Sequence, residues 1–124
     1  MKDFFLQKAP FAVPTTDGKL IEEHVGRVTT GDSNLSIAHM VAPPGWSEPH
    51  QNPEFDEYTL MVRGRKQIEI NGEKVTLKPG ESILIKKGVR VKYSNPFDEE
   101  AEYWSVCIPA FSLDSVNREN DSSA

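Results

Sequence analysis

The fold class is decided by residues 67–77, which read Gln67-Ile68-Glu69-Ile70-Asn71-Gly72-Glu73-Lys74-Val75-Thr76-Leu77. Polar and apolar residues alternate over 67–70, and a period of two is typical of a β-strand with one buried face. Asn71-Gly72 is the strongest short signal for the turn of a β-hairpin. Val75-Thr76-Leu77 supplies the returning strand. The stretch therefore predicts two antiparallel strands.

Short apolar segments continue on both sides of this hairpin, separated by turns rich in the eight glycines and nine prolines of the chain. We expect a strand pair in Lys19–Val28 and strands at Asn34–Ala42, Phe55–Arg63, Gln67–Ile70, Val75–Leu77, Ser82–Ile85, Val89–Tyr93 and Ala101–Ile108. About nine strands joined by tight turns predict an all-β fold, either a sandwich or a barrel. A short helix is expected only at Leu113–Arg118, with Ser112 as its N-cap.

Length and charge limit the function. A chain of 124 residues is one domain by the usual size of domains. Its 14 Lys and Arg against 19 Asp and Glu give a net charge of -5. Nucleic acid is therefore not an expected partner, because phosphate binding needs a positive surface.

The expected location is the cytoplasm. The longest apolar runs, such as Ile83–Ile85, are too short to cross a membrane. Charged Lys2 and Asp3 stand where a signal peptide needs its apolar stretch. The single cysteine, Cys107, excludes an internal disulfide, which agrees with a reducing compartment.

Candidate metal ligands gather between Pro44 and Glu57. His50 and Asn52 are two residues apart, so in an extended segment their side chains point the same way. Glu57 begins the next expected strand and can turn inward beside them. Imidazole suits iron, nickel, copper or zinc, whereas carboxylate and amide oxygens suit manganese. His39, on the preceding strand, is either a core or surface histidine or, if its strand face lines the cavity, a further ligand.

The same stretch resembles the first motif of the cupin family, which is Gly, five residues, His-x-His, three or four residues, Glu, six residues, Gly. Here Gly45 stands one residue closer than expected to His50, and Asn52 replaces the second histidine. Glu57 and Gly64 follow at the spacing of the motif.

The second cupin motif is matched in its later half. Gly88 and Asn95 are present, while Lys86 stands where proline is usual and Val91 where the histidine should be. The resemblance covers residues 34–110. It implies a jelly-roll β-barrel, the cupin double-stranded β-helix, with its site in the barrel mouth. In typical cupins three histidines and one glutamate hold the metal.

The resemblance implies a single domain, residues 1–124. It would consist of an N-terminal arm (1–18), a barrel (19–110), and a C-terminal helix and tail (111–124). Cupins commonly dimerise, and the apolar residues at the start of the chain need cover, so we expect a homodimer. Those residues are Phe4, Phe5, Leu6 and Phe11.

Two functions are consistent with these residues. The favoured interpretation is a domain that binds a small molecule inside the barrel, because Val91 makes the site drier and cannot ligate a metal. The ligand would contact His50, Asn52, Glu57 and Tyr93 against a wall of Met61, Thr59 and Val91.

The alternative is a metal-dependent dioxygenase, isomerase or lyase acting on a small polar metabolite. Manganese, iron, nickel or zinc would then lie on His50 and Glu57, with Asn52 or His39 as an additional ligand. Tyr93 or Glu48 would transfer the proton.

Overall fold

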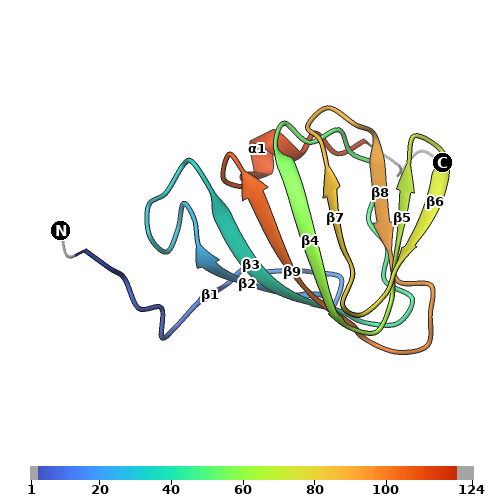
Figure 1. The fold of residues 1–124 in the computed structure, drawn as a ribbon, viewed down its shortest axis with the longest axis horizontal. Helices are drawn as coiled ribbons and strands as arrows, with labels where there is room; N and C mark the ends of the chain where they lie inside the picture. The colour runs from blue at the N-terminus through green and yellow to red at the C-terminus, as the bar shows by residue number, and fades with distance from the viewer. Residues whose placement is uncertain (1–2, 120–124) are drawn as a thin grey trace.

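Nine β-strands and one short helix make up the part of the chain described by the computed structural model, residues 3–119 (Figure 1). The strands are β1 (Phe11–Ala12), β2 (Leu20–Val25), β3 (Ser36–Ala42), β4 (Asp56–Arg63), β5 (Lys66–Ile70), β6 (Glu73–Leu77), β7 (Ser82–Ile85), β8 (Val91–Ser94) and β9 (Ala101–Ile108). The helix is α1 (Leu113–Val116). The predicted all-β fold class is confirmed.

The strands form two antiparallel sheets. The large sheet has the order β1-β2-β3-β9-β4-β7, and the small sheet has the order β6-β5-β8 (Figure 1). Within residues 3–119 no strand pairing joins the two sheets into the closed barrel that was expected. Isolated bridges Ser47↔Ser94 and Gln51↔Val91 instead lay the segment 47–51 along the free side of β8.

The predicted hairpin around Asn71-Gly72 is formed. Ile70 pairs with Glu73, which leaves Asn71-Gly72 as a two-residue loop between β5 and β6. Both loop residues have positive φ, 49° and 86°, which is the requirement of a type I′ turn.

Side chains alternate across the large sheet as its sequence predicts. Glu57, Thr59 and Met61 of β4 are buried, whereas Tyr58, Leu60 and Val62 are exposed. The residues of β9 alternate in the same way, with 101, 103, 105 and 107 buried. The core therefore lies between the two sheets, where Met61 and Tyr103 of the large sheet belong to one cluster with Ile68 and Val91 of the small one.

Two residues of the cupin motifs have structural roles. Gly64, after β4, has a φ of 72°, and a Cβ atom there would collide with the backbone carbonyl of Glu100. Asn95 is fully buried, and its amide donates to the carbonyl oxygens of Ala42 at 3.2 Å and of Glu99 at 2.8 Å. These two residues fix the turns at one end of the sheets.

Two expected elements are shorter in the structure. The segment Lys19–Val28 supplies one strand, β2, and its partner on one side is β1 from the N-terminal arm. The helix ends at Val116 rather than Arg118, because Asn117 takes the left-handed conformation, with φ 53° and ψ 54°. Ser112 is the N-cap as predicted. The predicted tail, 120–124, lies outside the described residues.

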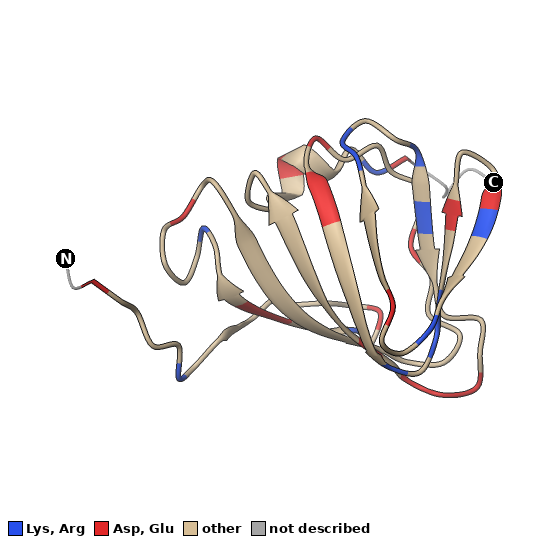
Figure 2. Cartoon of the chain, viewed as in Figure 1, with Lys and Arg blue, Asp and Glu red and all other residues tan. Residues whose placement is uncertain are grey.

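The surface differs between the sheets. Figure 2 shows little charge along β3 and β9, whereas the small sheet carries acidic and basic residues. The N-terminal arm extends away from the sheets in Figure 1, with Phe4, Phe5 and Leu6 exposed. Among residues 3–119, no helix has the length and apolar character needed to span a membrane.

Candidate functional site

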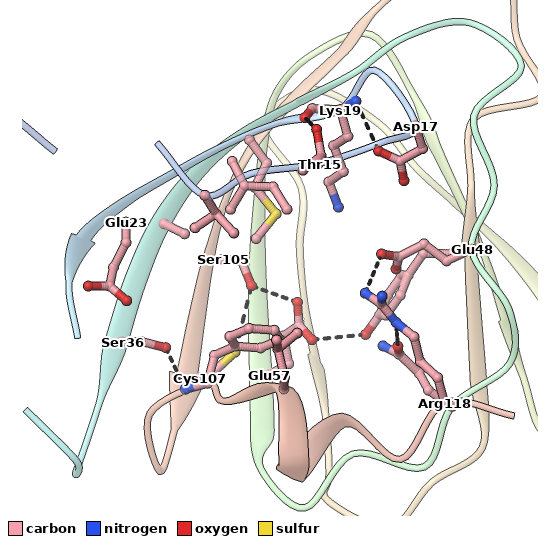
Figure 3. A pocket seen from close by; sticks show the side chains of 18 of the residues that line it. Thr15, Asp17, Lys19, Glu23, Ser36, Glu48, Glu57, Ser105, Cys107 and Arg118 are labelled. Carbon is pink, nitrogen blue, oxygen red and sulfur yellow. Dashed lines mark hydrogen bonds and ion pairs between the residues drawn. The ribbon is translucent and has the colours of Figure 1, made fainter. Parts of the chain in front are cut away.

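A pocket of about 260 Å³ lies on the inner face of the large sheet (Figure 3). Strands β3, β4 and β9 supply its floor, and the segments before β2, after β3 and after α1 supply its rim. One part of its wall is apolar, with Ile21, Ala38, Met40 and Phe55. The other part contains the charged and polar groups Lys19, Glu48, Glu57, Lys66, Tyr93 and Ser105.

Glu57 is the central acidic group. It lies on β4 beside Cys107 of β9, and both of its carboxylate oxygens accept hydrogen bonds. The Tyr93 hydroxyl donates to Oε1 at 3.3 Å, and the Ser105 hydroxyl donates to Oε2 at 2.6 Å (Figure 3). Burial, followed by the charge of Glu57, raises the pKa of Tyr93 well above its usual value, so the phenol keeps its proton.

Two lysines are buried in the pocket wall. Lys66 of β5 is 2% exposed and Lys19, just before β2, is 6% exposed. The Lys66 ammonium lies over the rings of Tyr103 and Tyr93, at 3.8 and 4.2 Å from their centroids. The Lys19 ammonium lies over the rings of Trp46 and Tyr103, at 4.2 and 5.4 Å. Neither ammonium forms an ion pair with a carboxylate of residues 3–119.

The neighbouring groups stabilise the charged form of Lys19. Burial lowers its pKa, but the neighbouring Tyr103 hydroxyl and the carboxylates of Glu48 and Glu57 outweigh burial, so the pKa lies above its ordinary value. Lys19 is therefore an ammonium at neutral pH.

The C-terminal segment closes one side of the pocket. Arg118 donates from Nη2 to Oε2 of Glu48 at 2.8 Å and from Nε to Oε1 of Gln51 at 3.3 Å (Figure 3). Glu48 is thus neutralised by a neighbouring guanidinium. The Cys107 thiol is also on the pocket wall, and burial raises its pKa far above the usual range.

The structure brings three of the predicted site residues together. Glu57, Tyr93 and Glu48 line the pocket. Thr59, Met61 and Val91 are buried in the adjacent core rather than in the pocket wall, and the Thr59 hydroxyl has no hydrogen-bond partner within residues 3–119.

The predicted nitrogen and amide ligands do not reach Glu57. Nε2 of His50 lies 2.5 Å from Oε2 of Glu69, outside the pocket. Nδ2 of Asn52 donates to the carbonyl oxygen of Gly88 at 3.3 Å. The predicted inward direction of His50 and Asn52 is therefore not found.

His39 lies on the outer face of the large sheet. Strand β3 directs Ser36, Ala38 and Met40 toward the pocket, so His39 points the other way. Its Nδ1 and Nε2 lie 2.9 Å from Glu22 and 2.8 Å from Glu102.

The position of Gln51 explains why His50 does not point into the pocket as predicted. Gln51 is buried, bridges to Val91 and lines the pocket. The cupin motif has five residues between its glycine and its first histidine. Counted from Gly45, the first histidine position is therefore Gln51 and the second is Pro53. The short spacing between Gly45 and His50 was the signal of this shift by one residue.

The donors present do not fit the four-ligand metal site that the resemblance implies. Of the four positions, only Glu57 carries a metal-ligating group of the expected kind, since Gln51, Pro53 and Val91 occupy the other three. Among residues 3–119 there is no group of three His, Cys, Asp or Glu side chains that could hold a metal ion.

Sequence reasoning missed Lys19, Lys66, Ser105, Gln51 and Arg118. A signal existed for Lys66, because it alternates in phase with Ile68 and Ile70 and so shares the inward face of its strand. Ser105 likewise shares a face with Tyr103 and Cys107. No local pattern marks Lys19 or Arg118.

Comparison with known proteins agrees with this architecture. The family model described as "Cupin domain" matches residues 38–109. The chain is 48% identical over 99 residues to a Myxococcus xanthus protein named Endoribonuclease YbeY. This match covers 80% of the chain but 34% of that protein, and the chain spans 62% and 46% of two further curated relatives.

Solved structures share the fold at low sequence identity. An RmlC-like cupin family protein with a double-stranded β-helix fold from Methanocaldococcus jannaschii aligns with a TM-score of 0.68 and 18% identity. The alignment covers 86% of this chain and 94% of that one. Streptomyces PAC13, determined with uridine, aligns with a TM-score of 0.75 and 14% identity, covering 97% of this chain and 92% of that one.

Proposed function

This chain belongs to the cupin family, and from that premise we propose that it binds a small organic molecule in the pocket on the inner face of its large sheet. The observation that carries the proposal is the meeting of charged and apolar groups in one pocket of about 260 Å³. Ligand sites typically combine an apolar wall with a few convergent polar groups. Here Met40 and Phe55 belong to the wall, and Glu57, Lys19 and Lys66 are the convergent groups.

Binding can be tested with a variant that fills the pocket. Ala38 lines it from the middle of β3, so Ala38→Phe adds a ring to the cavity. Val41→Phe is the matched control, because Val41 is on the opposite face of the same strand. We expect small polar metabolites that raise the melting temperature of the wild type to have no effect on Ala38→Phe, and to act normally on Val41→Phe. A ligand that stabilises all three proteins equally would refute binding in this pocket.

A second candidate function is an isomerase or lyase that removes a proton from the bound molecule. The observation in its favour is the carboxylate of Glu57, which faces the pocket and is held by two hydroxyl donors. Such a carboxylate can act as a general base, and Tyr93 can return a proton. Exchange of a ligand C–H into deuterated water should then depend on Glu57 and stop in Glu57→Gln. Binding without exchange would leave the domain as a binding module.

A further inference from the structure

Two buried lysine side chains line the pocket, and neither forms a direct ion pair among the described residues. Lys66 and Lys19 are 2% and 6% exposed, and both line the pocket. Burying an ammonium without a direct ion pair is costly, so such a group in a cavity wall indicates a ligand. At Lys19 the carboxylates of Glu48 and Glu57, which lie beyond ion-pair distance, offset part of this cost. We propose that Lys19 and Lys66 form an anion subsite that binds the carboxylate of a small organic acid; the proposal rests on ligand binding in this pocket.

The two ammoniums are arranged around one aromatic ring. They lie 5.4 and 3.8 Å from the centroid of Tyr103, and Trp46 and Tyr93 provide a second ring for Lys19 and Lys66 respectively. Aromatic faces orient a cation and attract it weakly, but they carry no net charge that would neutralise it. Figure 3 shows the Lys19 side chain directed into the open part of the pocket. The buried Tyr103 hydroxyl lies beside the Lys19 ammonium, so it is a further polar group at the same place.

Glu57 and Glu48 accept hydrogen bonds from groups other than these lysines. Glu57 accepts from Tyr93 and Ser105, and Glu48 pairs with Arg118. Glu57 and Glu48 thus already accept hydrogen bonds within the protein, whereas the two ammoniums retain donors for a ligand.

The fixed charges favour a singly charged ligand. The Glu57 carboxylate faces the same cavity, so it repels the second charge of a phosphate dianion more than it repels a single carboxylate. The wall of Ile21, Met40 and Phe55 is suited to an apolar body attached to that carboxylate. An acid of this kind would place its charged end on the lysines and its apolar end on the floor of the large sheet.

The test compares acids with their neutral isosteres on the full chain. Isothermal titration calorimetry at pH 7 would use benzoate, cinnamate and octanoate, each paired with its primary amide. We expect saturable binding of at least one acid and about tenfold or weaker binding of its amide, the effect of one lost charge-assisted hydrogen bond.

Two lysine variants locate the subsite. Lys66→Met and Lys19→Met should each lower the affinity for the acid by about tenfold or more, while leaving the affinity for the amide unchanged. Lys66→Arg, which keeps the charge, should retain the preference for the acid. Lys74→Met removes an exposed lysine of β6 and is the matched control, with no expected effect. Far-UV circular dichroism establishes that each variant is folded, and Lys19→Met and Lys66→Arg carry the test if Lys66→Met does not fold.

The outcomes separate this proposal from the proposed function. Equal affinities for acid and amide, unchanged affinities in both methionine variants, or no binding of any of the three acids would overturn the anion subsite. Binding that persists in Ala38→Phe would instead refute the pocket itself.

Discussion

Replacing Lys66 by methionine should stabilise the ligand-free protein. Its ammonium is 2% exposed and has no carboxylate partner within residues 3–119. Methionine has a similar length and flexibility, so it can occupy the same channel beside Tyr93 and Tyr103 without the charge. A residue that serves ligand binding is expected to lower the stability of the ligand-free protein.

The magnitude follows from the surroundings of the ammonium. Burial of an ion costs several kcal/mol after relaxation. The ring contacts at 3.8 and 4.2 Å return about 2 kcal/mol each. The net gain for Lys66→Met is therefore about 1–3 kcal/mol. For a domain of this size, that gain corresponds to a rise in melting temperature of roughly 3–12 °C.

Urea denaturation followed by circular dichroism would measure the difference. The exposed Lys74→Met variant, which should change the free energy of unfolding by less than about 0.5 kcal/mol, is the reference. A loss of more than about 1 kcal/mol in Lys66→Met would refute the reasoning, because the ammonium would then contribute net stability without a ligand.

Three further predictions concern other parts of the molecule. Manganese, iron, nickel or zinc should bind at well under one ion per chain, and elemental analysis should find the same metal content in the wild type and in His50→Ala. Loss of one ion per chain in His50→Ala would contradict the finding that Gln51, and not His50, faces the pocket. The pKa of His39 is lowered by burial but raised further by its hydrogen bonds to Glu102 and Glu22, so it lies above 6.5. Its imidazolium therefore contributes stability that is complete below pH 6.5 and declines as the pH rises through the raised value. In urea melts from pH 5.5 to 8.5, His39→Gln should lack this decline, and an unchanged slope would contradict it. The homodimer stays a prediction from the exposed arm, Phe4 to Leu6, and a monomer mass at micromolar concentration in light scattering would exclude it.

The local pattern of the chain was sufficient to predict most of the fold. The period of two in β4 placed Glu57, Thr59 and Met61 on one face, and these three are buried. The Asn71-Gly72 loop was also predictable from local sequence, because its conformation depends on two adjacent residues. The motif spacing from Gly45 to Gly64 correctly indicated the family, although Gln51 and not His50 occupies the first histidine position.

The site depended on contacts that no local pattern contains. Pro49 interrupts the alternation before His50, so only the bridge between Gln51 and Val91 shows which neighbour faces inward. Alternation likewise left open which face of β3 lines the pocket, and His39 proved to lie on the other one.

The sequence by itself determined the all-β architecture, its hairpins and the inward position of Glu57, because strand alternation and turn conformation are properties of adjacent residues. Only the tertiary structure decided that Lys19 and Lys66 are buried without a direct ion pair among residues 3–119. Their burial arises where the segment before β2, the small sheet and Tyr103 of β9 meet. These parts are distant in sequence, so no local pattern shows that they enclose the two charges.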